Sequence, residues 1–533
     1  MSSIRDGGED RSVPGEPLMD RSTKPAHLVE KSFHLISMFF LHSIIVDIAN
    51  FETQDNVSIF GTKNFKIVQV NGHSVLMKKQ QTTFSKVLIA NRGEIALRAV
   101  KTAKKMDIQS LAIYSTADKS SQHVLQADES VCIGPAPSSK SYLAKDAIIH
   151  TALHNACDAI YPGYGFLSEN AEFVDLCEAN NIKFIGPTAD SIRQMGDKST
   201  ARQIAITNNV PVVPGSDDAY EAEDAAMRAA KSIDYPLLLK ARAGGGGRGM
   251  QIVENDAEFA SAFQRCNAEA KNAFGDGHIY IEKYFKKIRH LEVQILGDGR
   301  GNAIALGERD CSVQRRHQKL IEEAPAAILD AKTRKELHKT AEMLAAGVNY
   351  EGAGTVEFIY DPVKREFFFI EMNTRIQVEH PVTEMLTGVD LVEAQFNIAQ
   401  DTTLNTILPR QSRSGHAIEF RINAEDWEQN FAPNPGKLSK WSPPKLPGVR
   451  TDTAVYEGYY IVPFYDSMIA KLIVHADSRD LAMSKARDAL KTFSIDGVKT
   501  TAGFHEKMLR HKAFLENDIS TRWVDEVFLR NNK

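Results

Sequence analysis

Short apolar runs alternate with helical segments from Lys86 onward, and this alternation restricts the fold more than any other feature of the sequence. "KVLIA" and "SLAIYS" have the length and composition of buried strands, and "GEIALRAVKTAKKM" between them has its apolar residues at helical spacing. Further apolar runs follow at "DAIYP" and "KFIGP", again with helical segments between them. Strands separated by helices predict a parallel sheet covered by helices, and we place this first domain at residues 85–195.

A different pattern of strands occupies residues 196–400. The runs "HLEVQILGD", "GNAIALGERDCS", "TVEFIYD" and "EFFFIEMN" are connected by turn residues such as Gly-Asp and Asp-Pro, which favours a mostly antiparallel sheet. A third region, 413–530, contains the strands "HAIEFRINAE" and "MIAKLIVHA" and ends in amphipathic helices.

Residues 1–84 do not resemble the rest of the chain. They mix charged residues with Gly, Ser and Pro, and their apolar stretch 33–51 is interrupted by His34, His42 and Asp47. A membrane-spanning helix needs about 20 mostly apolar residues, which this interrupted stretch does not provide. Transit peptides contain few acidic residues, whereas residues 1–32 contain several. We expect a weakly structured extension, with Met77 as a candidate for the natural start of the protein.

Composition excludes several classes of function. The 533 residues suggest about three domains. A net charge of −5 argues against a general affinity for nucleic acid. The five cysteines include no CxxC pair, which indicates a reducing compartment and neither a disulfide framework nor a zinc site.

A glycine run in "KARAGGGGRGM" has the spacing G-x-G-x-x-G, but its context does not fit a dinucleotide-binding turn. Such a turn opens a helix, whereas "MQIV" after the glycines is typical of a second strand. Strand, glycine turn and strand form a flap whose backbone N–H groups can approach phosphate oxygens, with Lys240 as a point charge. A plain flexible hairpin is the alternative.

Residues 370–381, "IEMNTRIQVEHP", alternate between polar and apolar side chains. With the period of a strand, Glu371, Asn373, Arg375, Gln377 and Glu379 fall on one face. A half-buried strand with one side in water is one interpretation. Two carboxylates around an amide, a guanidinium and a second amide also suit a metal ion and an anion bound side by side.

Two further clusters point to the same chemistry. Glu357 in "TVEFIY" and Glu371 lie on two strands joined by a short connection, so they can pair as a hairpin and offer oxygen ligands for Mg²⁺ together with Asn373. "ERDCSVQRRHQK", residues 308–319, gathers basic residues between acids, which suits a small anion. Ordinary surface glutamates and a solvated basic run are the alternatives.

The motifs "IANRGEIALR", "YPGYGFLSEN", "MGDK", "GGGGRGM", "ERDCSVQRRHQK", "EMNTRIQVEHPVTE" and "RINAED" occur in an order that resembles the biotin carboxylase family, which has the ATP-grasp fold. The likeness covers about residues 85–528, and the chain is most similar to the separate biotin carboxylase subunits of acetyl-CoA carboxylase. It implies a mixed α/β and α+β architecture. A Rossmann-like N-terminal domain is followed by an ATP-grasp domain with a glycine-rich lid and by a C-terminal biotin carboxylase domain.

The resemblance also implies roles for individual residues. ATP would contact Lys198, Lys240, Gly246, Gly247, Glu282, Lys283, Tyr284, Phe285, His290 and His317. Two Mg²⁺ or Mn²⁺ ions would bind Glu357, Glu371 and Asn373, of which the two glutamates also belong to the ATP site. Bicarbonate would bind Lys319, Arg375, Gln377 and Val378, and biotin would contact Arg421 and Tyr164. Glu379 would be the general base, and Lys319, Arg375 and Arg421 would complete the catalytic set.

The implied reaction is the ATP-dependent carboxylation of biotin with bicarbonate, through carboxyphosphate. It is the first half-reaction of acetyl-CoA carboxylase, whose product malonyl-CoA leads to fatty acid synthesis, and a cytoplasmic location is expected. The sequence has no "AMKM"-type biotin attachment motif, so biotin is expected on a separate biotin carboxyl carrier protein. Carboxyltransferase subunits and a homodimer are further implied partners, and nucleic acid and membrane are not. A propionyl-, methylcrotonyl- or geranyl-CoA carboxylase subunit, another ATP-grasp ligase and an inactive scaffold remain as alternatives.

Overall fold

The structure is a computed structural model that describes three strands between residues 58 and 78 and then residues 83–216, 218–242, 249–408 and 414–531. The chain divides into two compact units, Met1–Gln81 and Thr82–Lys533, which we describe separately. In the first unit, β1 (Ser58–Thr62), β2 (Phe65–Val70) and β3 (His73–Lys78) form an antiparallel sheet. The expectation of a weakly structured extension did not include these strands, and Met77 lies within β3.

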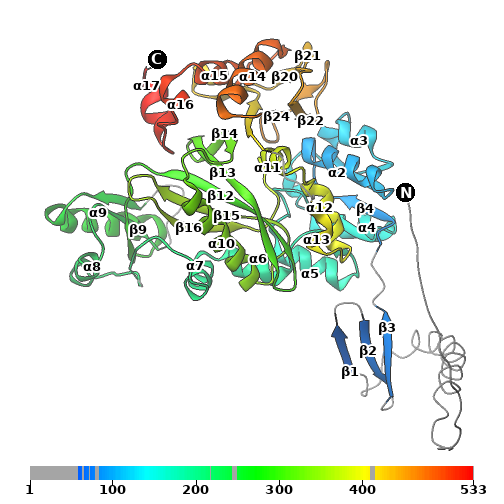
Figure 1. Ribbon diagram of the computed structural model, residues 1–533, viewed down its shortest axis with the longest axis horizontal. Coiled ribbons are helices and arrows are strands. Elements are labelled where there is room, and N and C mark those ends of the chain that lie inside the picture. The colour runs from blue at the N-terminus through cyan, green and yellow to red at the C-terminus, as the bar shows by residue number, and fades with distance from the viewer. Residues whose placement is uncertain are drawn as a thin grey trace, which may run out of the picture. The chain divides into compact units, whose positions relative to one another are not determined.

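The N-terminal domain of the second unit is built on a parallel sheet, as the alternation of strands and helices predicts. Its strands are β4 (Lys86–Ile89), β5 (Gln109–Ser115), β6 (Glu129–Gly134), β7 (Ala159–Tyr161) and β8 (Lys183–Phe184), in the order β6-β5-β4-β7-β8. Its helices are α2 (Gly93–Lys105), α3 (Gln122–Gln126), α4 (Lys145–His154), α5 (Ala171–Ala179) and α6 (Ala189–Gly196). Val87 and Ile89 share a hydrophobic core with α2, and Leu88 shares another with α4 and α5, so helices cover both faces of the sheet (Figure 1).

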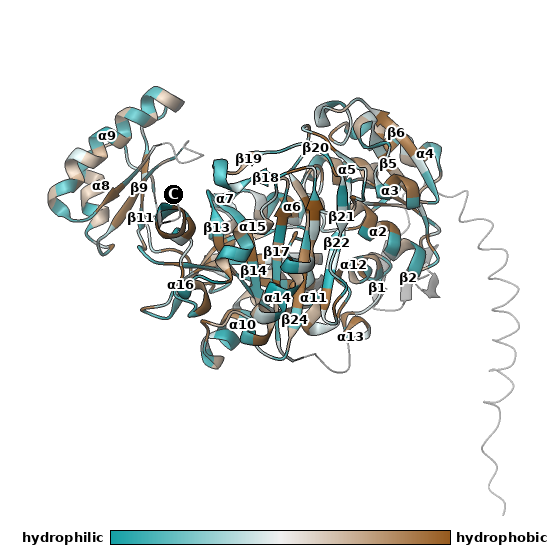
Figure 2. Cartoon of the chain, turned by 90° about the horizontal axis from the view of Figure 1, so that it is seen from above, coloured by the Kyte–Doolittle hydropathy of each residue, from teal (hydrophilic) through white to brown (hydrophobic). Residues whose placement is uncertain are grey.

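A small antiparallel sheet carries the strands on either side of the glycine run. β9 (Leu237–Ala241) lies between β10 (Met250–Val253) and β11 (Ile279–Lys283). The helices α8 (Glu223–Ala230) and α9 (Asp256–Phe274) bury their apolar residues against this sheet, whereas teal hydrophilic residues predominate on the outer side of α9 (Figure 2). The two strands that flank the glycine run are therefore confirmed as a hairpin, while residues 243–248 lie outside the described part.

A large antiparallel sheet joins the central and C-terminal regions. Its order is β16-β15-β12-β13-β14-β17-β24-β22. The strands are β12 (Arg289–Asp298), β13 (Ala303–Arg315), β14 (Gln318–Ala324), β15 (Glu351–Asp361), β16 (Glu366–Asn373), β17 (His416–Asn423), β22 (Val449–Thr453) and β24 (Met468–Ala476). Because β14 pairs with β17, the third region of the sequence extends the sheet of the second.

Helices flank this sheet. They are α7 (Lys198–Thr207), α10 (Ala331–Gly347), α11 (His380–Thr387), α12 (Leu391–Ala399), α13 (Leu404–Ile407), α14 (Arg479–Thr492), α15 (Ala502–Met508) and α16 (Lys512–Leu515). No helix in the described ranges combines the length and the apolar character that a membrane span requires.

The local sequence fixes where α11 begins and ends. Pro381 lies in its first turn, where the missing N–H removes no helical hydrogen bond. Gly388 ends the helix with a φ of 75°, a left-handed conformation that suits glycine. Glu379 immediately precedes the helix, so the positive end of the helix dipole favours its carboxylate.

The prediction of a strand through residues 371–379 is wrong beyond Asn373, where β16 ends; residues 374–379 form the turn that leads into α11. The alternation is also interrupted earlier. Glu357 pairs with Glu371 and Phe358 pairs with Phe369, so Ile370 is the extra residue of a β-bulge and is 41% exposed. Because paired residues of antiparallel strands point to the same side, the bulge turns Glu371 to the face that carries Glu357.

Candidate active site

Two carboxylates lie side by side on neighbouring strands of the large sheet. Glu357 on β15 pairs directly with Glu371 on β16, which confirms the predicted hairpin. Burial and the negative charge of Glu357 raise the pKa of Glu371. Within the described ranges, Glu371 has no hydrogen bond or ion pair. Paired carboxylates and an amide are the oxygen ligands that Mg²⁺ or Mn²⁺ prefers, so these residues fit a divalent cation.

A second group of ligand-type atoms lies close by but suits a metal less well. Atoms of His290, Glu292 and Glu357 all lie within 4.8 Å of one another. Glu292, however, is fully buried and already forms ion pairs with Arg309 and Lys319. Its charge is therefore neutralised by protein groups, whereas the charge of Glu371 is not.

Lys319 is the centre of the ion-pair network. Its Nζ donates to Glu292, to Glu357 Oε1 at 3.0 Å, to Glu379 Oε1 at 2.6 Å and to Gln377 Oε1 at 3.3 Å. Burial lowers the pKa of Lys319, but the charges of Glu292 and Glu379 outweigh it and hold the pKa well above its ordinary value. The structure thus brings two predicted bicarbonate ligands beside the predicted general base.

Glu379 is 2% exposed and lies between two cations. It accepts hydrogen bonds from Lys319 and, at 2.8 Å, from Arg421 Nη2. Burial raises the pKa of Glu379, but the charges of Lys319, Arg421 and Arg309 outweigh it and hold the pKa well below its ordinary value. Glu379 is therefore ionised, and its affinity for a proton will rise when another anion competes for either cation.

The remaining predicted bicarbonate and biotin residues lie on two separate hydrogen-bond paths. Arg375 donates from Nε to Glu169 at 2.8 Å and from Nη2 to Asn373 Oδ1 at 3.1 Å. The Tyr164 hydroxyl donates to Glu94. Glu94 also pairs with Lys471 at 3.0 Å, and Lys471 donates to the carbonyl oxygen of Val378 at 2.9 Å. Tyr164 is thus linked to the bicarbonate residues through a buried ion pair.

The predicted ATP residues divide between the two antiparallel sheets. On the small sheet, Lys240 pairs with Glu282 at 3.1 Å. Lys283 donates to the carbonyls of Asp234 and Tyr235. Past the end of that sheet, the Arg522 guanidinium lies over the Tyr284 ring at 5.2 Å, and the Phe285 ring lies 5.3 Å from that of Phe368 on β16.

On the large sheet, His290 Nε2 lies 2.9 Å from Glu357 Oε2. His317 is exposed in the turn between β13 and β14, where it and Arg316 both have positive φ. Lys198 begins α7 and is among the cations whose charge acts on Glu371. Gly246 and Gly247 lie outside the described residues.

Several residues of this network were not predicted as site residues, although Arg309 belongs to the motif at 308–319. Arg309 is fully buried and donates to Glu292, to Gln294 at 2.8 Å and to Thr383 at 3.0 Å. Glu292 and Gln294 stand at alternate positions of the otherwise apolar run "HLEVQIL". Two polar residues on one face of a buried strand are a signal that could have identified them.

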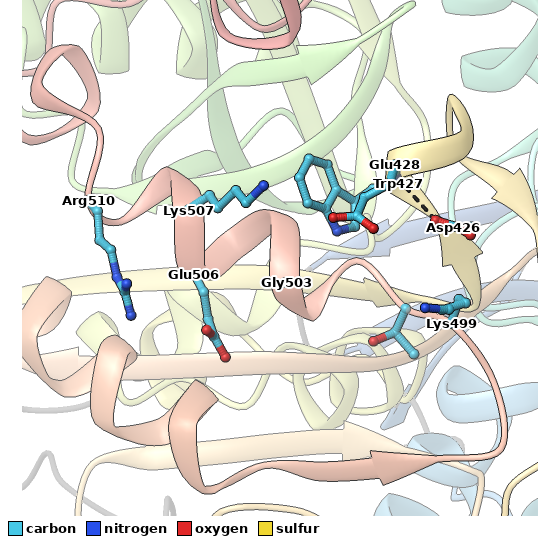
Figure 3. Close-up of a pocket in the computed structure, with 9 residues that line it drawn as sticks. Asp426, Trp427, Glu428, Lys499, Gly503, Glu506, Lys507 and Arg510 are labelled. Atoms are coloured by element: carbon cyan, nitrogen blue, oxygen red, sulfur yellow. Dashed lines mark hydrogen bonds between the residues drawn. The ribbon is translucent and has the colours of Figure 1, made fainter. Parts of the chain in front are cut away.

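A separate pocket lies away from this network. It has a volume of about 410 Å³ and opens on the C-terminal region, where Lys507 lies over the Trp427 ring at 4.4 Å (Figure 3). No predicted site residue lines it. The ion-pair network is the better candidate for catalysis, because its charged side chains are buried together, whereas those of the pocket are mostly exposed.

Three family models match consecutive parts of the chain. They are the biotin carboxylase N-terminal domain at residues 83–192, the ATP-binding domain of the carbamoyl-phosphate synthase L chain at 197–407, and the biotin carboxylase C-terminal domain at 419–526. A biotin carboxylase from Nostoc sp. is 50% identical over 444 residues, which cover 83% of this chain and 99% of the relative. The chain belongs to the biotin carboxylase family.

Solved structures of biotin carboxylases have the same fold. The enzyme of Campylobacter jejuni matches with a TM-score of 0.76 and 49% identity, over 83% of this chain and 99% of that one. The biotin carboxylase domain of a Hydrogenobacter thermophilus 2-oxoglutarate carboxylase matches with a TM-score of 0.73 and 45% identity, over 84% and 98%. That domain is described as a dimer in complex with MgADP, ADP and bicarbonate. The predicted family, fold class and ligase chemistry are confirmed.

Proposed function

We propose that this biotin carboxylase family member carboxylates biotin on a biotin carboxyl carrier protein, with ATP and bicarbonate as co-substrates. The position of Glu379 between Lys319 and Arg421 carries the proposal. A buried carboxylate paired with two substrate-binding cations gains proton affinity when substrates engage those cations, as a general base requires. An inactive scaffold has no need of such an arrangement.

The first step activates bicarbonate. Bicarbonate would lie against Lys319, Arg375, Gln377 and the backbone of Val378, and Glu379 would take its proton. A bicarbonate oxygen then attacks the γ-phosphorus of ATP, the bond to the bridging oxygen breaks, and ADP leaves. The product carboxyphosphate breaks down to CO₂ and phosphate.

ATP would extend across both antiparallel sheets. Its phosphates would meet Lys198, Lys240 and the lid glycines Gly246 and Gly247, because ammonium groups and close backbone N–H groups neutralise phosphate oxygens. The segment Glu282, Lys283, Tyr284 and Phe285 would receive the adenine, with His290 and His317 beside the nucleotide. Glu357, Glu371 and Asn373 would hold two Mg²⁺ or Mn²⁺ ions, which supply charge neutralisation for the phosphoryl group when bound.

The second step transfers CO₂ to biotin. Phosphate would remove the proton from biotin N1′, and the nitrogen would form a bond to the carbon of CO₂. Arg421 would stabilise the negative charge that develops on the ureido oxygen, since a guanidinium held in place costs no reorganisation during the reaction. Tyr164 would complete the biotin side of the site.

The complete carboxylase would include a biotin carboxyl carrier protein and carboxyltransferase subunits, with this chain as a homodimer. We favour acetyl-CoA carboxylase, whose product malonyl-CoA feeds fatty acid synthesis, over propionyl-, methylcrotonyl- or geranyl-CoA carboxylases. A cytoplasmic location is part of the proposal, and the five free cysteines support a reducing compartment.

The test is ATP hydrolysis by the purified chain with Mg²⁺ and bicarbonate, with and without free biotin. We expect biotin to stimulate bicarbonate-dependent turnover, and Glu379→Gln to lower that turnover by about 100-fold or more, as loss of a general base does. Glu366→Gln, an exposed change on β16, is the matched control and should behave like the unaltered chain. Retention of turnover by Glu379→Gln would contradict the role of Glu379. If neither biotin nor a biotinylated carrier protein stimulates turnover, the proposed function is wrong.

A further inference from the structure

Two buried carboxyl groups beside Arg421 have no part in the steps above. Glu322 on β14 and Glu419 on β17 are direct cross-strand partners, so their side chains leave the same face of the sheet, and both are 0% exposed. Arg421 follows Glu419 by two positions on the same strand and shares that face. Its Nε donates to Glu322 Oε1 at 2.6 Å.

These carboxyl groups have fewer hydrogen-bond donors than two buried carboxylates require. Within the described residues, Oε2 of Glu322 and both side-chain oxygens of Glu419 have no hydrogen-bond partner. An ionised carboxyl group in such a place is costly, because nothing replaces the water that it has lost. Protonation lowers that cost, because a neutral carboxyl group loses less hydration free energy on burial than a carboxylate.

The charged groups around Glu419 do not supply the missing partner. Those on the elements packed around it are Glu322, Arg421, Lys471, Glu379 and His380. Arg421 is shared by Glu322 and Glu379. Lys471, on β24, is fully buried and already engaged by Glu94 and by a backbone carbonyl. Burial lowers the pKa of His380 well below its ordinary value, so this ring carries no charge at neutral pH.

Electrostatics therefore favour one proton on this pair of carboxyl groups. Burial raises the pKa of Glu419 well above its ordinary value, although the charge of Lys471 opposes the shift. Burial also raises the pKa of Glu322 to about 7 against the opposing charge of Arg421. Glu322 has the arginine contact, so the negative charge belongs on Glu322 and the proton on Glu419.

We propose that Glu322 and Glu419 are positioning residues that hold Arg421 ready for biotin, with Glu322 ionised and Glu419 protonated. This inference rests on the proposed function of Arg421. The hydrogen bond from Nε to Glu322 fixes the guanidinium plane, and Nη2, which donates to Glu379, would exchange that acceptor for the ureido oxygen of biotin. A second negative charge on Glu419 would oppose the charge that develops on that oxygen.

The contribution of Glu322 is tested by steady-state kinetics of Glu322→Gln with free biotin. Loss of a charge-assisted hydrogen bond predicts a rise of about 10-fold to 100-fold in KM for biotin. Bicarbonate-dependent ATP hydrolysis without biotin should change much less, because that step does not use the ureido contact. A purely structural role would instead lower both rates and the Tm together, which overturns the proposal. If Glu322→Gln does not fold, Glu322→Asp is the second variant. It keeps the negative charge but moves it one methylene further from Arg421, so it should also raise the KM for biotin.

The proton on Glu419 is tested by the pH profile of Glu419→Gln, whose amide imitates the protonated acid. In the unaltered chain, loss of this proton at alkaline pH should lower the biotin-dependent rate. In Glu419→Gln that fall should be weakened or moved to higher pH, with Glu366→Gln as the matched control. Coincident profiles, or failure of Glu419→Gln to fold, would overturn the proposal. If neither free biotin nor a biotinylated carrier protein stimulates ATP hydrolysis by the unaltered chain, the proposed function itself fails. If biotin does stimulate the unaltered chain, and Glu322→Gln and Glu419→Gln have the same kinetics as that chain, only this inference fails.

Discussion

Replacing Lys319 with methionine preserves much of the side chain but removes its charge. We expect this change to reverse the direction in which pH changes the free energy of unfolding through the carboxyl groups around Lys319. Lys319 contacts Glu292, Glu357 and Glu379. Although burial raises the pKa of Glu357 and of Glu379, Lys319 is the largest of the charges that hold both pKa values well below the ordinary range. Groups whose folded pKa is lowered stabilise the protein above their unfolded pKa of about 4.3, and that stability is lost as the pH falls towards the folded pKa.

Removal of the Lys319 charge increases the excess of carboxyl groups over cations in the network. Glu292, Glu322, Glu357 and Glu379 would share Arg309 and Arg421. Burial then favours a proton on at least one of these carboxyl groups, whose folded pKa rises above the unfolded value. Such a group stabilises the fold at low pH, and that contribution is lost as the pH rises towards the folded pKa. One proton corresponds to about 1.4 kcal/mol per pH unit, so up to about 2.7 kcal/mol is lost between pH 5.5 and 7.5.

Urea unfolding at pH 5.5 and 7.5, without added metal, measures this difference. Over this interval the unaltered chain should lose little stability from Glu357 and Glu379, because both carboxyl groups are ionised at both pH values. Lys319→Met should lose up to about 2.7 kcal/mol more than the unaltered chain. Lys319→Arg keeps the charge and is the matched control. Equal pH dependence in Lys319→Met and the unaltered chain would refute this account of the network.

Three further predictions concern metal and nucleotide. Glu371→Gln should raise the Mg²⁺ concentration for half-maximal activity by about 10-fold or more, because it removes one of two paired carboxylates; an unchanged metal titration would contradict the assignment. Deletion of Ile370 should remove the bulge and leave Glu371 paired with Glu357 on the same face of the sheet, so Mg²⁺-dependent stabilisation in thermal unfolding should persist; its loss would show that the bulge itself is needed to aim Glu371. Phe285→Ala should raise the KM for ATP by about 2-fold to 10-fold through loss of ring contacts, and an unchanged KM would exclude Phe285 from the nucleotide site.

Periodicity in the sequence was sufficient to predict the main elements of the fold. The parallel sheet followed from apolar runs separated by helical segments, and the hairpin of Glu357 and Glu371 followed from two strands with a short connection. Periodicity failed after Asn373 because one bulged residue and the start of a helix both change the direction of side chains without changing the polar pattern.

The network residues without a motif could not be predicted for a different reason. Glu322, Glu419 and Lys471 are charged residues within strands, where a solvent-exposed position is the ordinary expectation. Their importance depends on β14 pairing with β17 and β17 with β24, which are contacts between residues far apart in the chain. No local pattern specifies which strands become neighbours in an antiparallel sheet.

The sequence by itself determined the family, the order of the domains and the chemical types present at the site, because these depend on residue identity and local spacing. The tertiary structure decided which charges share a cation. It placed Glu379 between Lys319 and Arg421, and it left the buried carboxyl group of Glu419 without a hydrogen-bond partner among the described residues. The physical reason is that proton affinity depends on burial and on charges a few ångströms away, and these are set by packing between distant segments of the chain.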